Sequence, residues 1–171
     1  PQTAPLFAGD MRVAPGQPNL LAVRRNVDLI GRSGAGIVLF DDAVQRPLVA
    51  QISASSDWGN VAWDASGDFI YTNQALLAVD ADGPAFVDHL RRSEGRVHFF
   101  NGLIYGDDAE IVDPAAPMSF VRFQTLGQSR AASLDVQKNR AYFATQYLGG
   151  EAAGYIEVFN LATRELVGRA R

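Results

Sequence analysis

The sequence predicts an all-β fold made of a repeated unit of four short strands, and three observations lead to this prediction. No long stretch places apolar residues at the i, i+3, i+4, i+7 spacing of an amphipathic helix. Short runs rich in β-branched and aromatic residues alternate instead with Gly, Asp, Asn, Ser and Pro. These runs also recur in the same order along the chain. The clearest are GIVLFD at 36–41, DFIYTN at 68–73, GLIYG at 102–106, RAYFAT at 140–145 and YIEVFN at 155–160.

The repeated unit has a period of roughly 40 residues. Its most regular mark is an apolar run closed by Asp or Asn, which occurs at Asp41, Asp80, Asp113 and Asn160. Two further runs precede each of these closed runs, and a turn and a fourth run follow it. Four strands in about 40 residues are typical of a β-propeller blade, whose two faces become buried when blades stack on one another.

The predicted architecture is therefore an all-β β-propeller with about four four-stranded antiparallel blades. The blades are expected near 19–52, 60–90, 96–124 and 131–169, within a single partial propeller domain over residues 1–171. We expect these blades to be part of a larger propeller. A complete four-bladed ring and a ring closed by two copies of the chain are the alternatives.

The strands of the first blade are expected near 19–24, 27–31, 36–41 and 46–52. Residues 1–17 contain a further run, LFAGDMRVA, which is interpreted as the outer strand of an earlier blade.

Two segments carry a resemblance to known repeats. FIYTNQ followed by LLAVDADG, and AYFATQ followed by GYIEVFNLATRELVG, resemble the bacterial propeller repeats of the YVTN, NHL and lactonase-like kind. The third repeat, FFNGLIYGDDAEIVDPAAP, is similar to repeats of secreted or cell-surface bacterial proteins with Ig-like neighbours. The Trp63-Asp64 pair closes a first strand rather than a third, so it does not mark a WD40 repeat. Because propellers have many unrelated activities, the resemblance implies a fold more than a function.

Composition excludes several classes of partner and chemistry. The formal net charge of -4 argues against a nucleic-acid or anionic membrane surface, since both need a concentrated positive field. The absence of cysteine excludes disulfides, cysteine-based zinc sites and a cysteine nucleophile. No apolar run approaches the ~20 residues of a membrane span. We expect an exported protein, located outside the cell, in the periplasm or on the cell surface.

Two acidic stretches are predicted to be turns rather than metal sites. The DADG stretch at 80–83, with Asp88, lacks the oxygen ligands that a calcium loop needs at its fifth and twelfth positions, the latter being Arg91. Asp107 and Asp108 fall where the second and third strands of a blade are joined. A polar turn explains both stretches.

The histidines and the glycine-rich stretch also give no evidence of a metal site or a phosphate-binding loop. His98 is expected on an inner strand and His89 on an outer strand, so a metal site shared by the two is not expected. The glycine-rich stretch at 31–36 lacks the Lys-Ser/Thr of a phosphate loop and is interpreted as a strand connection. The sequence thus predicts no catalytic residue, no metal and no cofactor.

The predicted function is a non-enzymatic binding or interaction module with a protein or carbohydrate ligand. Ligands of propellers usually lie where the loops between blades converge, which indicates the loops 53–60, 91–96 and 125–131. Trp58 is the best candidate for an exposed ligand-binding aromatic residue, because it stands among small polar residues in the first of these loops.

Two alternatives stay open at the level of sequence. The chain could be a fragment of a lactonase-like or quinoprotein-like enzyme, with Asp64, Arg96, Asp135 and Arg24 around the axis. It could also be a purely structural repeat that self-associates through open blade faces.

Overall fold

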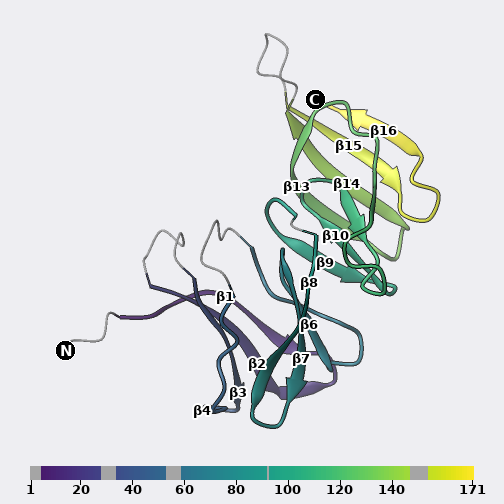
Figure 1. Cartoon of the computed structure of the whole chain (residues 1–171). Coiled ribbons are helices and arrows are strands. Elements are labelled where there is room, and N and C mark those ends of the chain that lie inside the picture. The colour runs from purple at the N-terminus through teal and green to yellow at the C-terminus, as the bar shows by residue number, and fades with distance from the viewer. Residues whose placement is uncertain (1–4, 28–33, 53–58, 92, 147–153) are drawn as a thin grey trace.

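The computed structural model describes residues 5–27, 34–52, 59–91, 93–146 and 154–171. All regular structure in these residues is β-strand, and it forms four separate four-stranded antiparallel sheets. Figure 1 shows the sheets following one another in chain order, with the first and the fourth at opposite ends of the molecule. No helix in the described part of the chain is long and apolar enough to cross a membrane. The all-β class and the four antiparallel blades are confirmed.

Each sheet is built from four strands that are consecutive in the sequence, so each is one blade. The first sheet contains β1 (Phe7–Ala14), β2 (Gln17–Asn26), β3 (Gly34–Asp41) and β4 (Val44–Gln45). The second contains β5 (Ala62–Trp63), β6 (Phe69–Tyr71), β7 (Ala75–Asp80) and β8 (Gly83–His89). The third contains β9 (Val97–Phe100), β10 (Leu103–Gly106), β11 (Glu110–Val112) and β12 (Phe120–Arg122). The fourth contains β13 (Gln128–Asp135), β14 (Arg140–Gln146), β15 (Gly154–Asn160) and β16 (Leu166–Ala170).

The first blade begins earlier than the sequence indicates. β1 pairs with β2 through a two-residue turn at Pro15-Gly16, with Ala14 opposite Gln17. The expected first strand at 19–24 is therefore part of the second strand, and the run assigned to an earlier blade is the first strand of this one. The run was correctly interpreted as a strand but was assigned to the wrong blade, because β1 is mostly exposed and resembles an outer strand.

The rest of the first blade also departs from the expected strands. The expected strand at 27–31 lies almost entirely outside the described residues. Within 46–52, only Ala50 makes a bridge, to Ile37, while the named fourth strand is β4. The first sheet therefore spans 7–45, in place of the predicted 19–52.

Consecutive sheets pack through three apolar clusters, and this packing explains why apolar residues occupy both faces of the inner blades. The cluster between the first and second sheets includes Leu39 and Trp63, and that between the second and third includes Tyr71 and Ile104. The cluster between the third and fourth sheets is aromatic and is centred on Phe123. Each blade is thus stabilised mainly by its neighbours.

Polar side chains connect the innermost strands of neighbouring blades. Asp10 Oδ2 accepts a hydrogen bond from Val61 N at 3.0 Å, which joins the first blade to the second. Asn60 donates to Val97 O at 2.9 Å and accepts from Val97 N at 2.7 Å, which joins the second to the third. These bonds fix the first strands of the first three sheets next to one another.

The predicted hairpin turn at 64–68 is confirmed, and Asp64 organises it. Asp64 Oδ1 accepts hydrogen bonds from Gly67 N at 2.9 Å and Phe69 N at 3.0 Å, and Ser66 Oγ donates to Oδ2. Burial alone would raise the pKa of Asp64, but these hydrogen bonds outweigh it and lower the pKa below its ordinary value of 3.8.

Asp64→Asn is therefore expected to lower the free energy of unfolding at pH 7. A group whose pKa is lowered by folding stabilises the fold above its ordinary pKa, and this stabilisation is lost as the pH falls through the lowered value. The difference from the wild type should therefore shrink below about pH 4, which urea unfolding at pH 7 and pH 3 would measure. Asp68→Asn is the matched control, because that carboxylate accepts no hydrogen bond among the described residues. Equal loss in both variants at pH 7 would contradict the assignment.

Candidate ligand site

A polar cavity lies between the third and fourth sheets, at the end of the molecule where the interblade loops lie. Its volume is about 290 Å³. The loop from β8 to β9 and the loop from β12 to β13 border it, and these contain two of the three loops that the sequence indicates. The lining residues are Arg91, Glu94, Asp108, Glu110, Arg122, Thr125, Gly127, Gln128 and Ser129.

Glu110 is the centre of the outer part of the cavity. It is only 3% exposed, and it lies directly opposite Arg122 across the β11–β12 pair. Its carboxylate accepts a hydrogen bond from Arg122 Nη2 at 2.6 Å and from Arg91 Nε at 3.1 Å. The guanidinium of Arg91 also lies 3.7 Å from the centre of the Phe120 ring. Two cations share one buried carboxylate, so this end of the cavity carries surplus positive charge.

Carboxylates gather at the inner part of the cavity. Asp108 accepts hydrogen bonds from Ser93 Oγ at 3.0 Å, Glu94 N at 2.9 Å and Glu110 N at 3.2 Å. Glu94 Oε2 accepts a hydrogen bond from Gln128 Nε2 at 3.4 Å, which connects the two interblade loops. The cavity is therefore polarised, with guanidinium groups toward the outer strand and carboxylates toward the inner strands.

The Asp107-Asp108 turn holds the loops in place. Asp107 accepts hydrogen bonds from Arg96 N at 2.8 Å, in the preceding loop, and from Ala132 N at 2.8 Å, on the first strand of the next blade. The prediction that these residues form a turn is confirmed, and the structure adds that the turn connects three segments.

Gly95→Ala is expected to weaken this arrangement. Gly95 has a φ of +92°, and a Cβ atom there would lie 2.8 Å from Asp107 Oδ2. The backbone strain alone costs on the order of 1–3 kcal/mol, and the displaced carboxylate would also lose its bond to Arg96 N. Gly102→Ala is the control, because its φ is +80° but no atom lies within 4 Å of the added Cβ. Urea unfolding should show a larger loss for Gly95→Ala, and equal losses would exclude the contact with Asp107.

The fourth blade repeats the buried glutamate–arginine pair. Glu157 on β15 is fully buried and lies opposite Arg169 on β16. It accepts hydrogen bonds from Arg169 Nε at 2.6 Å and from Leu126 N at 2.9 Å, in the loop that precedes its blade. Glu110 also holds the loop that precedes its blade, but it does so through the side chain of Arg91 rather than through a backbone N–H.

The repeated pair is visible in the sequence, and our sequence analysis missed it. In both blades the arginine follows the glutamate after 12 residues, in EIVDPAAPMSFVR and EVFNLATRELVGR. A comparison of the repeats residue by residue would have identified Glu110 and Arg122 as a pair. The part of Arg91 could not be found in this way, because no counterpart of it occurs in the fourth blade.

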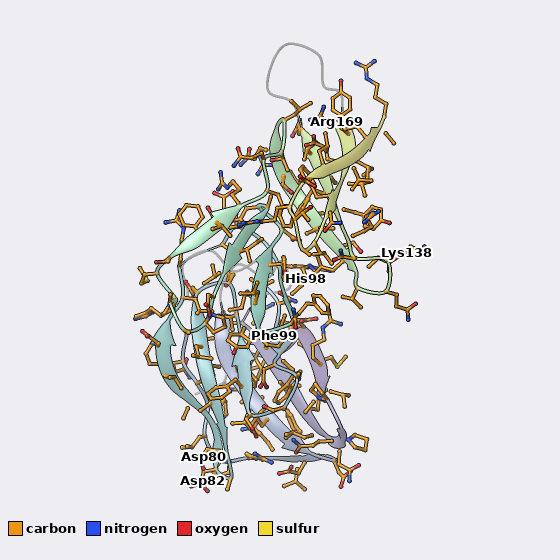
Figure 2. The ribbon with its side chains drawn as sticks, turned by 90° about the vertical axis from the view of Figure 1, so that its right-hand side faces the viewer. Asp80, Asp82, His98, Phe99, Lys138 and Arg169 are labelled. Atoms are coloured by element: carbon orange, nitrogen blue, oxygen red, sulfur yellow. The ribbon has the colours of Figure 1, made fainter. Side chains whose placement is uncertain are left out.

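The structure separates the residues considered for metal binding. His89 lies on the outer strand β8 and His98 on the inner strand β9, and the described residues contain no group of three His, Asp or Glu that could hold a metal ion. Asp80 and Asp82 lie at the tip of the β7–β8 hairpin, far from Arg169 (Figure 2). The carbonyl of Asp82 accepts a hydrogen bond from Leu48 N at 2.8 Å, so this turn packs on the first blade.

The four residues considered for an enzyme do not converge. Asp64 and Asp135 lie at the hairpins that follow the first strands of their blades, whereas Arg96 precedes a first strand and so lies at the other end. Arg24 is on β2, a second strand, and it donates a hydrogen bond to Gly59 O at 2.6 Å. Its placement on an inner strand was wrong because β1 had been assigned to another blade.

A second hollow, of about 280 Å³, follows the inner strands β1, β5 and β9. Arg12, Trp63, His98 and Phe99 are among the residues that border it, and Figure 2 shows the last two on adjacent positions of one strand. Trp58, the aromatic residue predicted to bind ligand, and most of the loop 53–60 lie outside the described residues.

Stacked four-stranded antiparallel blades define the chain as a β-propeller. No protein-family model matches the chain, and no curated protein does either. Its fold is similar to that of AztD from Citrobacter koseri, with a TM-score of 0.52 and 16% identity over 93% of this chain. It is also similar to the dihydro-heme d1 dehydrogenase NirN in complex with DHE, with a TM-score of 0.60 and 14% identity over 91% of this chain. The match covers 45% of the AztD chain and 35% of the NirN chain.

Proposed function

We propose that the chain is a non-enzymatic binding module within a larger β-propeller of an exported or cell-surface bacterial protein. The observation that carries this proposal is the polar cavity between the third and fourth blades, which lies at the interblade loops and is held by a buried carboxylate. The proposal includes the kinship of the repeats with the YVTN, NHL and lactonase-like propellers, and a ligand-binding role for Trp58.

The hydrogen bonding around the cavity favours binding over catalysis. Glu110 accepts hydrogen bonds from two arginines, and Asp108 accepts them from two donors in the preceding loop and from Glu110 N. An acid or base catalyst must exchange a proton with its substrate, and these two groups instead hold the walls. A shaped, rigid cavity with polar groups at fixed places is what selective binding of a small ligand needs.

Apolar residues on the outward faces of the first and fourth blades support the proposal that the chain is part of a larger propeller. Met11, Val23 and Val38 align across three strands of the first sheet, on the face opposite its core. Met11 is 57% exposed there although Val23 and Val38 are buried, and Ile156 on the outward face of the fourth sheet is 44% exposed. Corresponding faces inside the chain are buried against the next blade, so we propose that further blades of the same polypeptide cover these two.

Solution mass tests this part of the proposal against a purely structural, oligomerising repeat. With both end faces uncovered, the 171-residue chain should bind a hydrophobic dye such as ANS and remain a monomer or a weakly associated species by light scattering. A stable dimer of defined mass would favour ring closure by a second copy. A monomer that binds no dye would contradict the uncovered faces.

Binding is tested on glycan and peptide arrays with the wild-type chain and two variants. Arg122→Gln changes the wall of the cavity, whereas Arg169→Gln changes the equivalent pair of the fourth blade. A ligand that is captured by the wild type and by Arg169→Gln but not by Arg122→Gln would support the cavity as the binding site. Equal capture by all three would place binding elsewhere, and Trp58→Ala would then test the loop 53–60.

A further inference from the structure

We infer that the cavity is built for a small zwitterion, and specifically for a free α-amino acid. Its carboxylate would lie at Arg122 and its ammonium group at Glu94. This inference rests on the proposed function, since it names the ligand class of the same cavity.

The outer end of the cavity offers a guanidinium with unused donors. Arg122 commits Nη2 to Glu110, while its Nε and Nη1 have no hydrogen-bond partner among the described residues. Its side chain is 50% exposed, so a ligand can reach it. Guanidinium presents a planar pair of N–H groups that matches a carboxylate. Arg91 adds a second positive charge beside the same buried glutamate.

The inner end of the cavity offers a carboxylate with unused acceptors. Glu94 is exposed, and the only hydrogen bond that its carboxylate accepts among the described residues is the long one from Gln128. Asp108 lies beside it and contributes further negative charge. An ammonium group carries three donors and would satisfy oxygen atoms at this end.

Opposite charges line the two ends of the cavity and favour a ligand that carries both signs. Among the described residues, Arg91 and Arg122 with Glu110 leave the outer end net positive, while Asp108 and Glu94 make the inner end negative. A lone anion would leave the inner carboxylates without a partner, and a lone cation would leave the free donors of Arg122 without an acceptor. A zwitterion matches both ends at once, because the positive and negative walls belong to different strands and loops. No aromatic side chain lines the cavity in the described part of the chain, so a sugar ring would lack an apolar surface to lie on.

The repeat of the buried pair shows which part of the site is specific. Glu157 and Arg169 have the same cross-strand geometry, and Glu157 holds a loop through a backbone N–H. The glutamate–arginine pair is thus a general anchor of these blades. Among the described residues, only the third-blade pair lies beside Arg91, Glu94 and the cavity. We therefore assign ligand binding to this pair and not to its counterpart in the fourth blade.

Isothermal titration of the 171-residue chain with named probes tests the inference. The probes are glycine, serine, leucine, glutamate and arginine, the N-acetyl and the amide derivatives of the best binder, and glucose. We expect one or more free amino acids to bind, with at least a tenfold loss of affinity on either acetylation or amidation. Arg122→Gln and Glu94→Gln should each weaken binding at least tenfold, while Arg169→Gln should leave it unchanged.

Other outcomes distinguish a failure of the inference from a failure of the proposed function. Equal affinity for the free and the acetylated amino acid, or equal effects of Arg122→Gln and Arg169→Gln, would overturn the zwitterion. If no amino acid binds at millimolar concentration while an array ligand is lost in Arg122→Gln, the inference fails and the proposed function stands. If Arg122→Gln is poorly folded, Glu94→Gln decides alone, because that side chain is exposed and its replacement leaves the buried pair intact.

Discussion

Replacing Phe123 by alanine is expected to lower the free energy of unfolding by about 3–5 kcal/mol. Phe123 is fully buried, and its ring centre lies 4.9 Å from that of Phe143 and 5.3 Å from that of Phe159. It follows the last strand of the third blade, so its side chain fills the contact between that blade and the fourth. The variant would leave a cavity between two sheets whose packing depends on each other.

Urea unfolding followed by circular dichroism and by tryptophan fluorescence would measure this effect. Phe86→Ala is the matched control, because Phe86 is 51% exposed on an outer strand, and its loss should cost no more than about 0.5 kcal/mol. If the two variants lose similar stability, the aromatic cluster does not hold the blades together. If Phe123→Ala unfolds in two steps, the fourth blade separates before the rest.

The arrangement of blades could be predicted because the repeat is encoded locally. Each third strand ends in Asp or Asn at a turn, and the hairpin at 64–68 contains the residues that its turn needs. β1 was predicted as a strand but assigned to an earlier blade, because its side chains are mostly solvent-exposed and only a two-residue turn indicated that it pairs with β2.

The candidate site could be predicted only as a place, not as a set of residues. The loops 91–96 and 125–131 do border the cavity. Glu110, however, looks like an ordinary polar position in a short strand, and it is buried only because the neighbouring blade and loop cover it. Its bond to Arg91 joins residues 19 apart that belong to different segments, which no local pattern encodes.

Glu157→Ala is expected to lower the free energy of unfolding by about 3 kcal/mol. Glu157 is fully buried, and its loss removes the acceptor of Arg169 Nε and of Leu126 N at once. A buried donor without an acceptor costs about 1–3 kcal/mol, and a charged donor costs more. Arg169 is 36% exposed on its side chain, so water offsets part of this cost. Urea unfolding at pH 7 gives the value directly.

The double variant Glu157→Met with Arg169→Met tests whether the cost comes from the unpaired partner. Replacing both members of a buried ion pair with apolar residues of similar size is often neutral, while removing one member is not. The double variant should therefore be more stable than Glu157→Ala, and a double-mutant cycle with Glu157→Met and Arg169→Met as its single variants should give a coupling energy of about 1–3 kcal/mol. Leu126 N would still lose its acceptor, so a residual loss of about 1 kcal/mol should remain. If the double variant is the less stable of the two, the unpaired Arg169 is not the source of the loss in Glu157→Ala, because both variants remove the acceptor of Leu126 N equally.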